Sequence, residues 1–149
     1  MKKQITLCIV LAMCAFINTS HAQDRGGPHG NALNVFFGFG ETTSISSYYE
    51  FEVHPDITVS PVVNIWFGDY DGFGLGVRGD YYFDRLLKLH EAWDIFAGLD
   101  TNVNFDGGDF NIQGHMGAEF LITNKFGIVA ETGFGSINSI SVGLGIHLN

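Results

Sequence analysis

Alternating apolar and polar side chains between residues 73 and 83 constrain the fold more strongly than any other feature of the chain. The segment reads FGLGVRGDYYF, with apolar residues such as Phe73 and Val77 at odd positions and Arg78 at an even one. A period of two places the odd side chains together on one face of a β-strand. Eleven residues is also about the length that a tilted strand needs to cross a bilayer. The segment therefore predicts a membrane-spanning strand with one lipid-facing side.

The same alternation recurs along the chain and gives eight segments in all, an even number that suits a small closed barrel. Short connections between them predict antiparallel hairpins. The exception is 84–91, whose leucines and basic residues predict one turn of amphipathic helix at a membrane interface. We therefore predict an all-β fold, an eight-stranded antiparallel up-and-down transmembrane β-barrel domain over residues 31–149. The predicted strands are 32–40, 45–54, 57–67, 73–83, 92–105, 110–122, 125–134 and 139–148.

Residues 1–22 read as a cleaved secretory signal peptide, with two lysines at the start, an apolar run and the small-x-small sequence Ser20, His21, Ala22. A lipoprotein signal with the lipid on Cys14 is the weaker alternative, because Met13 stands where such signals have a small residue. Residues 23–30 are rich in glycine and charge, and predict a flexible N-terminal tail.

Removal of the first 22 residues leaves 127 of the 149, enough for one domain. All sixteen acids remain against five bases, so the net charge becomes −11, which argues against nucleic acid as a partner. Both cysteines lie in the signal peptide, so disulfides and thiolate chemistry are excluded from the mature chain. No run of 18 apolar residues follows the signal, and any membrane span must therefore be built from strands.

Aromatic residues fall at the two ends of the predicted lipid-facing positions, with aliphatic residues such as Val77 and Leu99 between them. Two aromatic girdles around an aliphatic band are typical of barrels in outer membranes. A soluble, lipocalin-like barrel around a hydrophobic ligand is the alternative, although its solvated face would be richer in lysine and arginine. The predicted membrane-interface aromatics are Phe67, Phe73, Tyr81, Phe83, Trp93, Phe105, Phe110, Phe120, Phe126 and Phe134.

With its signal, its strand count, its girdles and the hairpins YYFDRLLKLHEAWDIFAGLD and LITNKFGIVAETGFG, the chain resembles the small eight-stranded outer-membrane β-barrel proteins of Gram-negative bacteria, of the outer-membrane protein X and A-domain type. The resemblance covers 31–149. It implies location in the cell outer membrane, contact with outer-membrane lipid and lipopolysaccharide, and assembly by the barrel-assembly machinery. Members usually end in an aromatic residue, whereas this chain ends in Leu148 and Asn149.

The inward-facing positions collect most of the acids, together with one arginine and several histidines. So many acids in a narrow lumen favour a structural network that fills the barrel, with Arg78 beside Asp80 and Asp100. A narrow, porin-like cation leak or a proton-linked site is the functional alternative. The predicted lumen polar network is Glu50, Glu52, Arg78, Asp80, Asp100, His115, Glu119 and Glu131; Asp94, His54 and His147 share the inward parity.

We expect no enzymatic activity, no cofactor and no metal site. The resemblance allows a palmitoyltransferase or a deacylase of lipid A, but acyl chemistry needs a base near the outer rim, and the predicted outer loops hold no histidine. The run 69–72 matches half of a calcium loop without its later glutamate. The sequence therefore predicts a monomeric barrel with a packed polar interior and a structural or interaction role at the cell envelope.

Overall fold

The computed structural model describes residues 30–68, 71–90, 92–137 and 139–148. The predicted signal peptide and nearly all of the predicted tail lie outside these ranges. The largest difference from the predicted bounds is at the start of β2, which begins two residues early, at Thr43. The elements are β1 (Ala32–Gly40), β2 (Thr43–His54), β3 (Ile57–Phe67), β4 (Gly72–Tyr82), α2 (Asp84–Leu87), β5 (Trp93–Asn104), β6 (Phe110–Thr123), β7 (Phe126–Gly135) and β8 (Ser139–His147).

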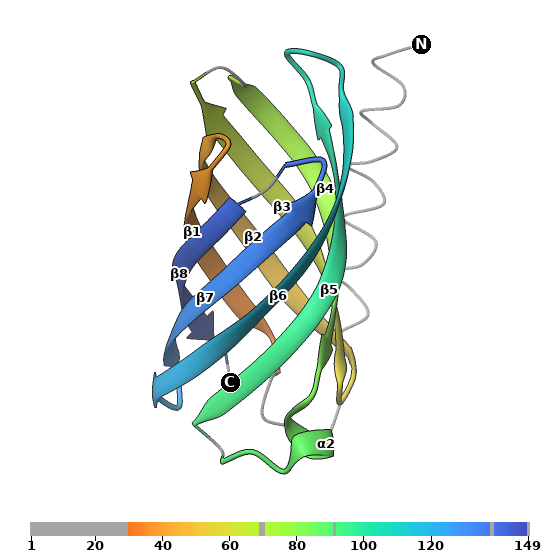
Figure 1. The fold of residues 1–149 in the computed structure, drawn as a ribbon. Coiled ribbons are helices and arrows are strands. Elements are labelled where there is room, and N and C mark those ends of the chain that lie inside the picture. Colours follow the sequence, from red (N-terminus) through yellow and green to blue (C-terminus); the bar gives the residue numbers. More distant parts are fainter. Residues whose placement is uncertain (1–29, 69–70, 91, 138, 149) are drawn as a thin grey trace.

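The eight strands form one closed barrel in which each strand pairs with its neighbours in the sequence (Figure 1). Every pairing is antiparallel, and β1 closes the barrel against β8 from Ala32↔His147 to Gly40↔Ser139. The predicted eight-stranded up-and-down topology is confirmed. Closure leaves no strand edge without a partner, which is the condition for strands to lie in lipid.

The barrel has two unlike ends. The connections after His54, Tyr82 and Thr123 lie at one end, which we call the α2 end because the helix lies there (Figure 1). The connections after the other strands lie at the opposite end, which we call the loop end. Within 84–91, where one turn of amphipathic helix is predicted, the structure has a helix over Asp84–Leu87.

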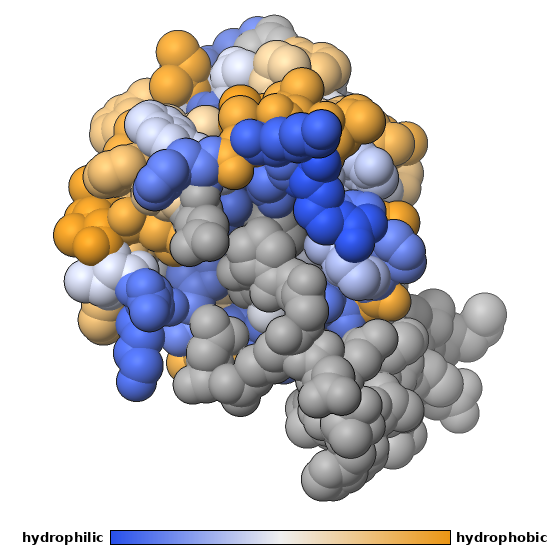
Figure 2. Space-filling model, turned by 90° about the horizontal axis from the view of Figure 1, so that it is seen from below, coloured by the Kyte–Doolittle hydropathy of each residue, from blue (hydrophilic) through white to orange (hydrophobic). Residues whose placement is uncertain are grey.

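Polarity is inverted relative to a water-soluble protein. On adjacent positions of β4, Val77 is 55% exposed and Arg78 is 4% exposed. The exposed set contains many valine, isoleucine, leucine and phenylalanine side chains, whereas the buried set contains asparagine, aspartate, glutamate and arginine. Figure 2, a view from the α2 end, shows hydrophobic residues around the circumference. This arrangement is the reverse of the lipocalin-like alternative, whose apolar face would line the interior.

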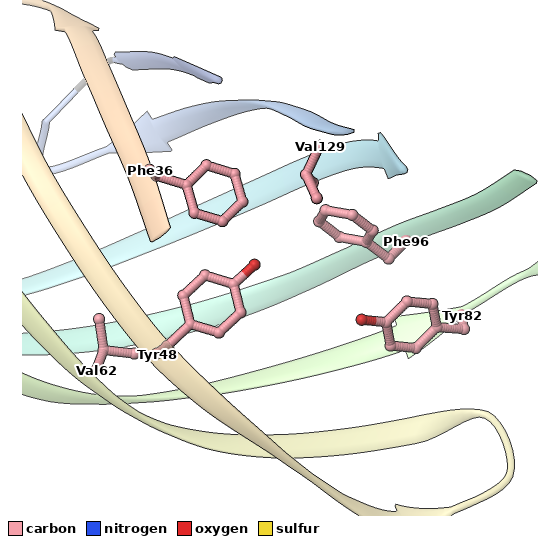
Figure 3. Packing of buried hydrophobic residues seen from close by; sticks show 6 residues of the cluster. All are labelled: Phe36, Tyr48, Val62, Tyr82, Phe96 and Val129. Carbon is pink, nitrogen blue, oxygen red and sulfur yellow. The ribbon is translucent and has the colours of Figure 1, made fainter. Parts of the chain in front are cut away.

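Rings and glycines share the interior in the α2 half of the barrel. Phe36, Tyr48, Val62, Tyr82, Phe96 and Val129 form a buried cluster (Figure 3). The rings of Phe36 and Tyr48 stack with centroids 5.4 Å apart. A Cβ atom at Gly117 would lie 2.6 Å from Cζ of Phe96, and one at Gly143 would lie 2.8 Å from Cδ1 of Phe36. The glycines on inward positions therefore make room for the rings that fill a narrow barrel.

Of the predicted interface aromatics, all are exposed on the outer surface except Phe83, which is half-buried. Trp93 and Phe120 contact each other at the α2 end, with ring centroids 4.9 Å apart. At the loop end, Phe73 and Phe105 stack at 5.9 Å. The rings thus lie as pairs at both ends of the aliphatic surface.

Candidate functional site

Arg78 is the only arginine or lysine among the buried residues that the structure describes, and it organises the interior. Its Nε and Nη2 donate to the two carboxylate oxygens of Asp80 at 2.6 and 3.0 Å. Its Nη1 donates to Oε2 of Glu131 on β7 at 2.8 Å. The guanidinium carbon lies 4.3 Å from the ring centroid of Tyr48. The buried cation is therefore bound by a two-bond fork, a second carboxylate and an aromatic face.

His115 on β6 joins this ion pair to β5. Its Nε2 lies 2.6 Å from Oδ1 of Asp80, and its Nδ1 lies 3.2 Å from Oδ2 of Asp100. Both ring nitrogens thus face carboxylate oxygens. A neutral imidazole has a single N–H, so the second contact requires a further proton on the ring or on a carboxyl group. The geometry fits an imidazolium that donates to both aspartates.

The hydrogen bonds continue into the loop half of the lumen. Nδ2 of Asn102 donates to Oδ1 of Asp100 at 2.7 Å. Oδ1 of Asn102 accepts from Nδ2 of Asn64, and Oδ1 of Asn64 accepts from Oγ of Ser46 at 2.5 Å. The result is one unbroken series, which we call the lumen chain. It comprises Glu131, Arg78, Asp80, His115, Asp100, Asn102, Asn64 and Ser46, and links β7, β4, β6, β5, β3 and β2.

Five residues of the predicted polar network belong to this chain, and three lie apart from it. Glu50 accepts from the hydroxyl of Tyr82 at 2.8 Å, and Glu119 lies 3.0 Å from Nε2 of His147. Glu52 is half-buried near the start of the barrel domain, where it accepts from the backbone N–H of Gly30 at 2.9 Å. The predicted network is thus divided into separate groups along the barrel axis.

The predicted contact of Arg78 with Asp100 is not among the hydrogen bonds of the lumen chain, and Arg78 binds the more distant Glu131 instead. Asp100 is the register partner of Arg78 on the neighbouring strand. Its carboxylate nevertheless binds His115 and Asn102, while the guanidinium extends to Glu131. A flexible arginine selects the carboxylates that it can meet in fork geometry, and adjacency in the sheet does not determine that choice.

Sequence reasoning missed the amide and hydroxyl members of the chain, Ser46, Asn64 and Asn102. They share the inward parity of the acids, and that parity is the signal that could have found them. Buried Asn104 and Ser141 lie in the same half of the barrel, so the loop half of the lumen is lined by neutral polar groups. The charged groups occupy the middle and the α2 half.

The histidines and acids of the described ranges do not gather into a metal-binding group. No three histidine, cysteine, aspartate or glutamate side chains of the described residues form a group that could hold a metal ion. The described histidines lie in the lumen or at the α2 end, where His54 and His90 are exposed. None of the helices in the described part of the chain is long and apolar enough to cross a membrane.

The hydroxyl groups of Thr58 and Ser60 on β3 are fully buried and have no hydrogen-bond partner in the described structure. Removing a hydroxyl that makes no bond removes a desolvation penalty. We therefore expect Ser60→Ala to leave the free energy of unfolding unchanged or to raise it. The matched change Ser46→Ala removes a bond to Asn64 and should lower it by about 0.5–1.5 kcal/mol. Urea unfolding of both folded variants in detergent micelles measures the difference; a larger loss for Ser60→Ala would show that its hydroxyl has a partner.

Comparisons with known proteins place the fold. No family model matches the chain, and no curated protein matches it. A solved structure titled "De novo design of transmembrane beta-barrels" is similar with a TM-score of 0.70 and 13% identity, over 83% of this chain and 98% of that one. The N-terminal β-barrel domain of Pseudomonas aeruginosa OprF has a TM-score of 0.54 and 13% identity, over 78% of this chain and 95% of that one. The Yersinia pestis outer membrane protein Ail has a TM-score of 0.54 and 11% identity, over 79% of this chain and 98% of that one. The chain thus has the fold of small outer-membrane β-barrels.

Proposed function

We propose that this protein is an integral β-barrel of the bacterial outer membrane, of the kind represented by outer-membrane protein X. The inverted polarity carries the proposal, because an exterior of aliphatic side chains between aromatic pairs is stable in lipid and not in water. The predicted signal peptide supports export. The α2 end then faces the periplasm, and the loop end faces lipopolysaccharide.

The interior supports a structural or interaction role for a closed monomer. The lumen chain ties six strands together, and the aromatic cluster fills the interior beside it. A barrel filled in this way presents its outer wall and its loop end to partners, and leaves its interior occupied by its own side chains. We propose that the protein has no enzymatic activity. Its expression should therefore leave the mass spectrum of lipid A unchanged.

The first test is expression with the native leader, followed by isolation of outer membranes and detergent gel electrophoresis of unboiled and boiled samples. A folded barrel in that fraction should migrate differently before and after boiling, because the closed sheet resists detergent at room temperature. A soluble periplasmic protein without a mobility shift would refute the proposal.

A narrow cation leak is the second candidate, and the excess of carboxylates in the lumen favours it. Asp80, Asp100, Glu119 and Glu131 outnumber the two cations of the lumen, Arg78 and the His115 imidazolium, so the interior would select cations if it opened. Single-channel recordings in planar bilayers separate the two candidates. The closed barrel should give no steps at moderate voltage, whereas the leak should give cation-selective steps.

A further inference from the structure

Exposed charges separate completely between the two ends of the barrel within the described residues. The exposed acids are Glu41, Asp71, Asp106 and Asp109, and all four lie at the loop end. The exposed bases are Arg85, Lys88 and Lys125, and all three lie at the α2 end. For a chain with a formal charge of −9, an end at which the exposed charged side chains of the described residues are all basic is the unexpected feature.

The α2 segment is held in a fixed position between the ends of β4 and β5. Oδ1 of Asp84 accepts from the backbone N–H of Ile95 at 3.1 Å, and Lys88 ends the helix in the left-handed conformation with φ of 51°. Leu86 and Leu87 are 68% and 53% exposed. The helix therefore presents two leucines to the surroundings directly before a lysine. This is the pattern of a segment that lies in a membrane interface, with apolar side chains in the acyl region.

The three bases differ in whether a carboxylate of the described residues neutralises them. Arg85 donates from Nε and Nη2 to the two oxygens of Asp56 at 2.6 and 2.5 Å. These hydrogen bonds raise the pKa of Arg85, so the guanidinium stays charged and its charge is matched. Within the described part of the chain, neither Lys88 nor Lys125 forms a salt bridge.

Lys125 has an equally defined position, in the turn between β6 and β7. Its backbone N–H donates to Oγ1 of Thr123, and its carbonyl accepts from the N–H of His147 at 2.8 Å. The neighbouring girdle aromatic is Phe126, which is exposed. In Figure 2 this end of the barrel shows hydrophilic residues bordered by hydrophobic ones. Both lysines therefore stand where the aromatic girdle meets water, at the depth of lipid phosphates.

We propose that the α2 end is a binding surface for anionic phospholipids, in which Lys88 and Lys125 contact headgroup phosphates while Leu86 and Leu87 enter the acyl region. The proposal rests on the membrane-spanning function proposed above. It adds a lipid partner in the leaflet at the α2 end only, since the acidic loop end repels anionic lipids.

The test uses the folded protein in vesicles of phosphatidylcholine that contain a trace of spin-labelled phosphatidylglycerol or spin-labelled phosphatidylcholine. Electron paramagnetic resonance measures the fraction of each label immobilised at the protein surface. One lysine near lipid headgroups contributes about 1 kcal/mol, or roughly a five-fold preference. We therefore expect spin-labelled phosphatidylglycerol to be enriched several-fold over spin-labelled phosphatidylcholine at low salt. The enrichment should fall as salt is added.

Matched variants locate the effect. Lys88→Gln/Lys125→Gln should abolish the enrichment, and Lys88→Arg/Lys125→Arg should retain it. Asp106→Asn/Asp109→Asn removes two charges at the loop end and should not lower the enrichment. Equal immobilisation of both lipids by the native chain, or full enrichment in the glutamine variant, would overturn the inference while the inserted barrel stands. Failure of the chain to fold into vesicles at all would instead count against the proposed function.

Discussion

Replacing Arg78 with methionine is expected to lower the free energy of unfolding by about 3–5 kcal/mol, the usual cost of leaving a buried charge without its partner. Asp80 and Glu131 both accept hydrogen bonds from this guanidinium, and Asp80 is almost fully buried. Methionine is unbranched and close to arginine in volume, so the change removes charge more than volume. It also removes the guanidinium from the ring of Tyr48. Urea unfolding in detergent micelles, followed by tryptophan fluorescence, measures the loss.

A triple variant distinguishes lost charge from lost packing. Arg78→Met combined with Asp80→Asn and Glu131→Gln removes the two carboxylates together with the cation. The side-chain amide that Asp80→Asn introduces keeps a carbonyl oxygen, which can still accept from His115 in the geometry of the native pair. Since neutral replacement of a whole buried ion cluster is often tolerated, the triple variant should recover most of the stability. If the single variant costs less than about 1 kcal/mol, well below the usual cost of an unpaired buried charge, Arg78 is not the organising group of the lumen.

The barrel itself could be predicted from the period of two, because a closed sheet with unlike faces forces every strand to alternate. That regularity places Arg78 and Asp80 inside and Val77 outside without any tertiary knowledge. The short connections then leave antiparallel neighbours as the only arrangement. Strand ends were less well determined, because at the loop end β2 extends two residues beyond the clear alternation, to Thr43.

Contacts across the lumen could not be predicted in the same way. They depend on the tilt and stagger of the strands, which fix the height at which inward side chains of distant strands meet. Arg78 and Glu131 are 53 residues apart and belong to strands that are not neighbours, yet they form a 2.8 Å ion pair. Parity alone also gives no reason to choose Asn64, over any other inward polar residue, as the hydrogen-bond partner of Asn102. The sequence therefore predicted the members of the interior better than their pairing.

Placing an arginine at the middle of the outer wall is the second change with a large expected effect. Leu99 lies near the centre of the twelve-residue strand β5, is 64% exposed, and faces outward beside Gly79 and Gly114 of the neighbouring strands. An arginine near the midplane of a bilayer costs about 2–4 kcal/mol, and near an interface about 0–1 kcal/mol. Leu99→Arg should therefore lower the free energy of unfolding in phospholipid vesicles by the larger amount.

The matched control is the same substitution at the rim. Leu148, directly after β8 at the α2 end, is also exposed, at 52%, so Leu148→Arg changes the chemistry equally and only the depth differs. Asp100→Asn provides the second comparison, since it lies one residue from Leu99 but faces the lumen. Its amide oxygen can still accept from Asn102, and its amide N–H can donate to Nδ1 of a neutral His115, so no buried charge is left without a partner. Both should cost much less than Leu99→Arg. Equal losses at Leu99 and Leu148 would mean that no bilayer surrounds the wall, and equal losses at Leu99 and Asp100 would mean that the two faces of β5 are assigned the wrong way round.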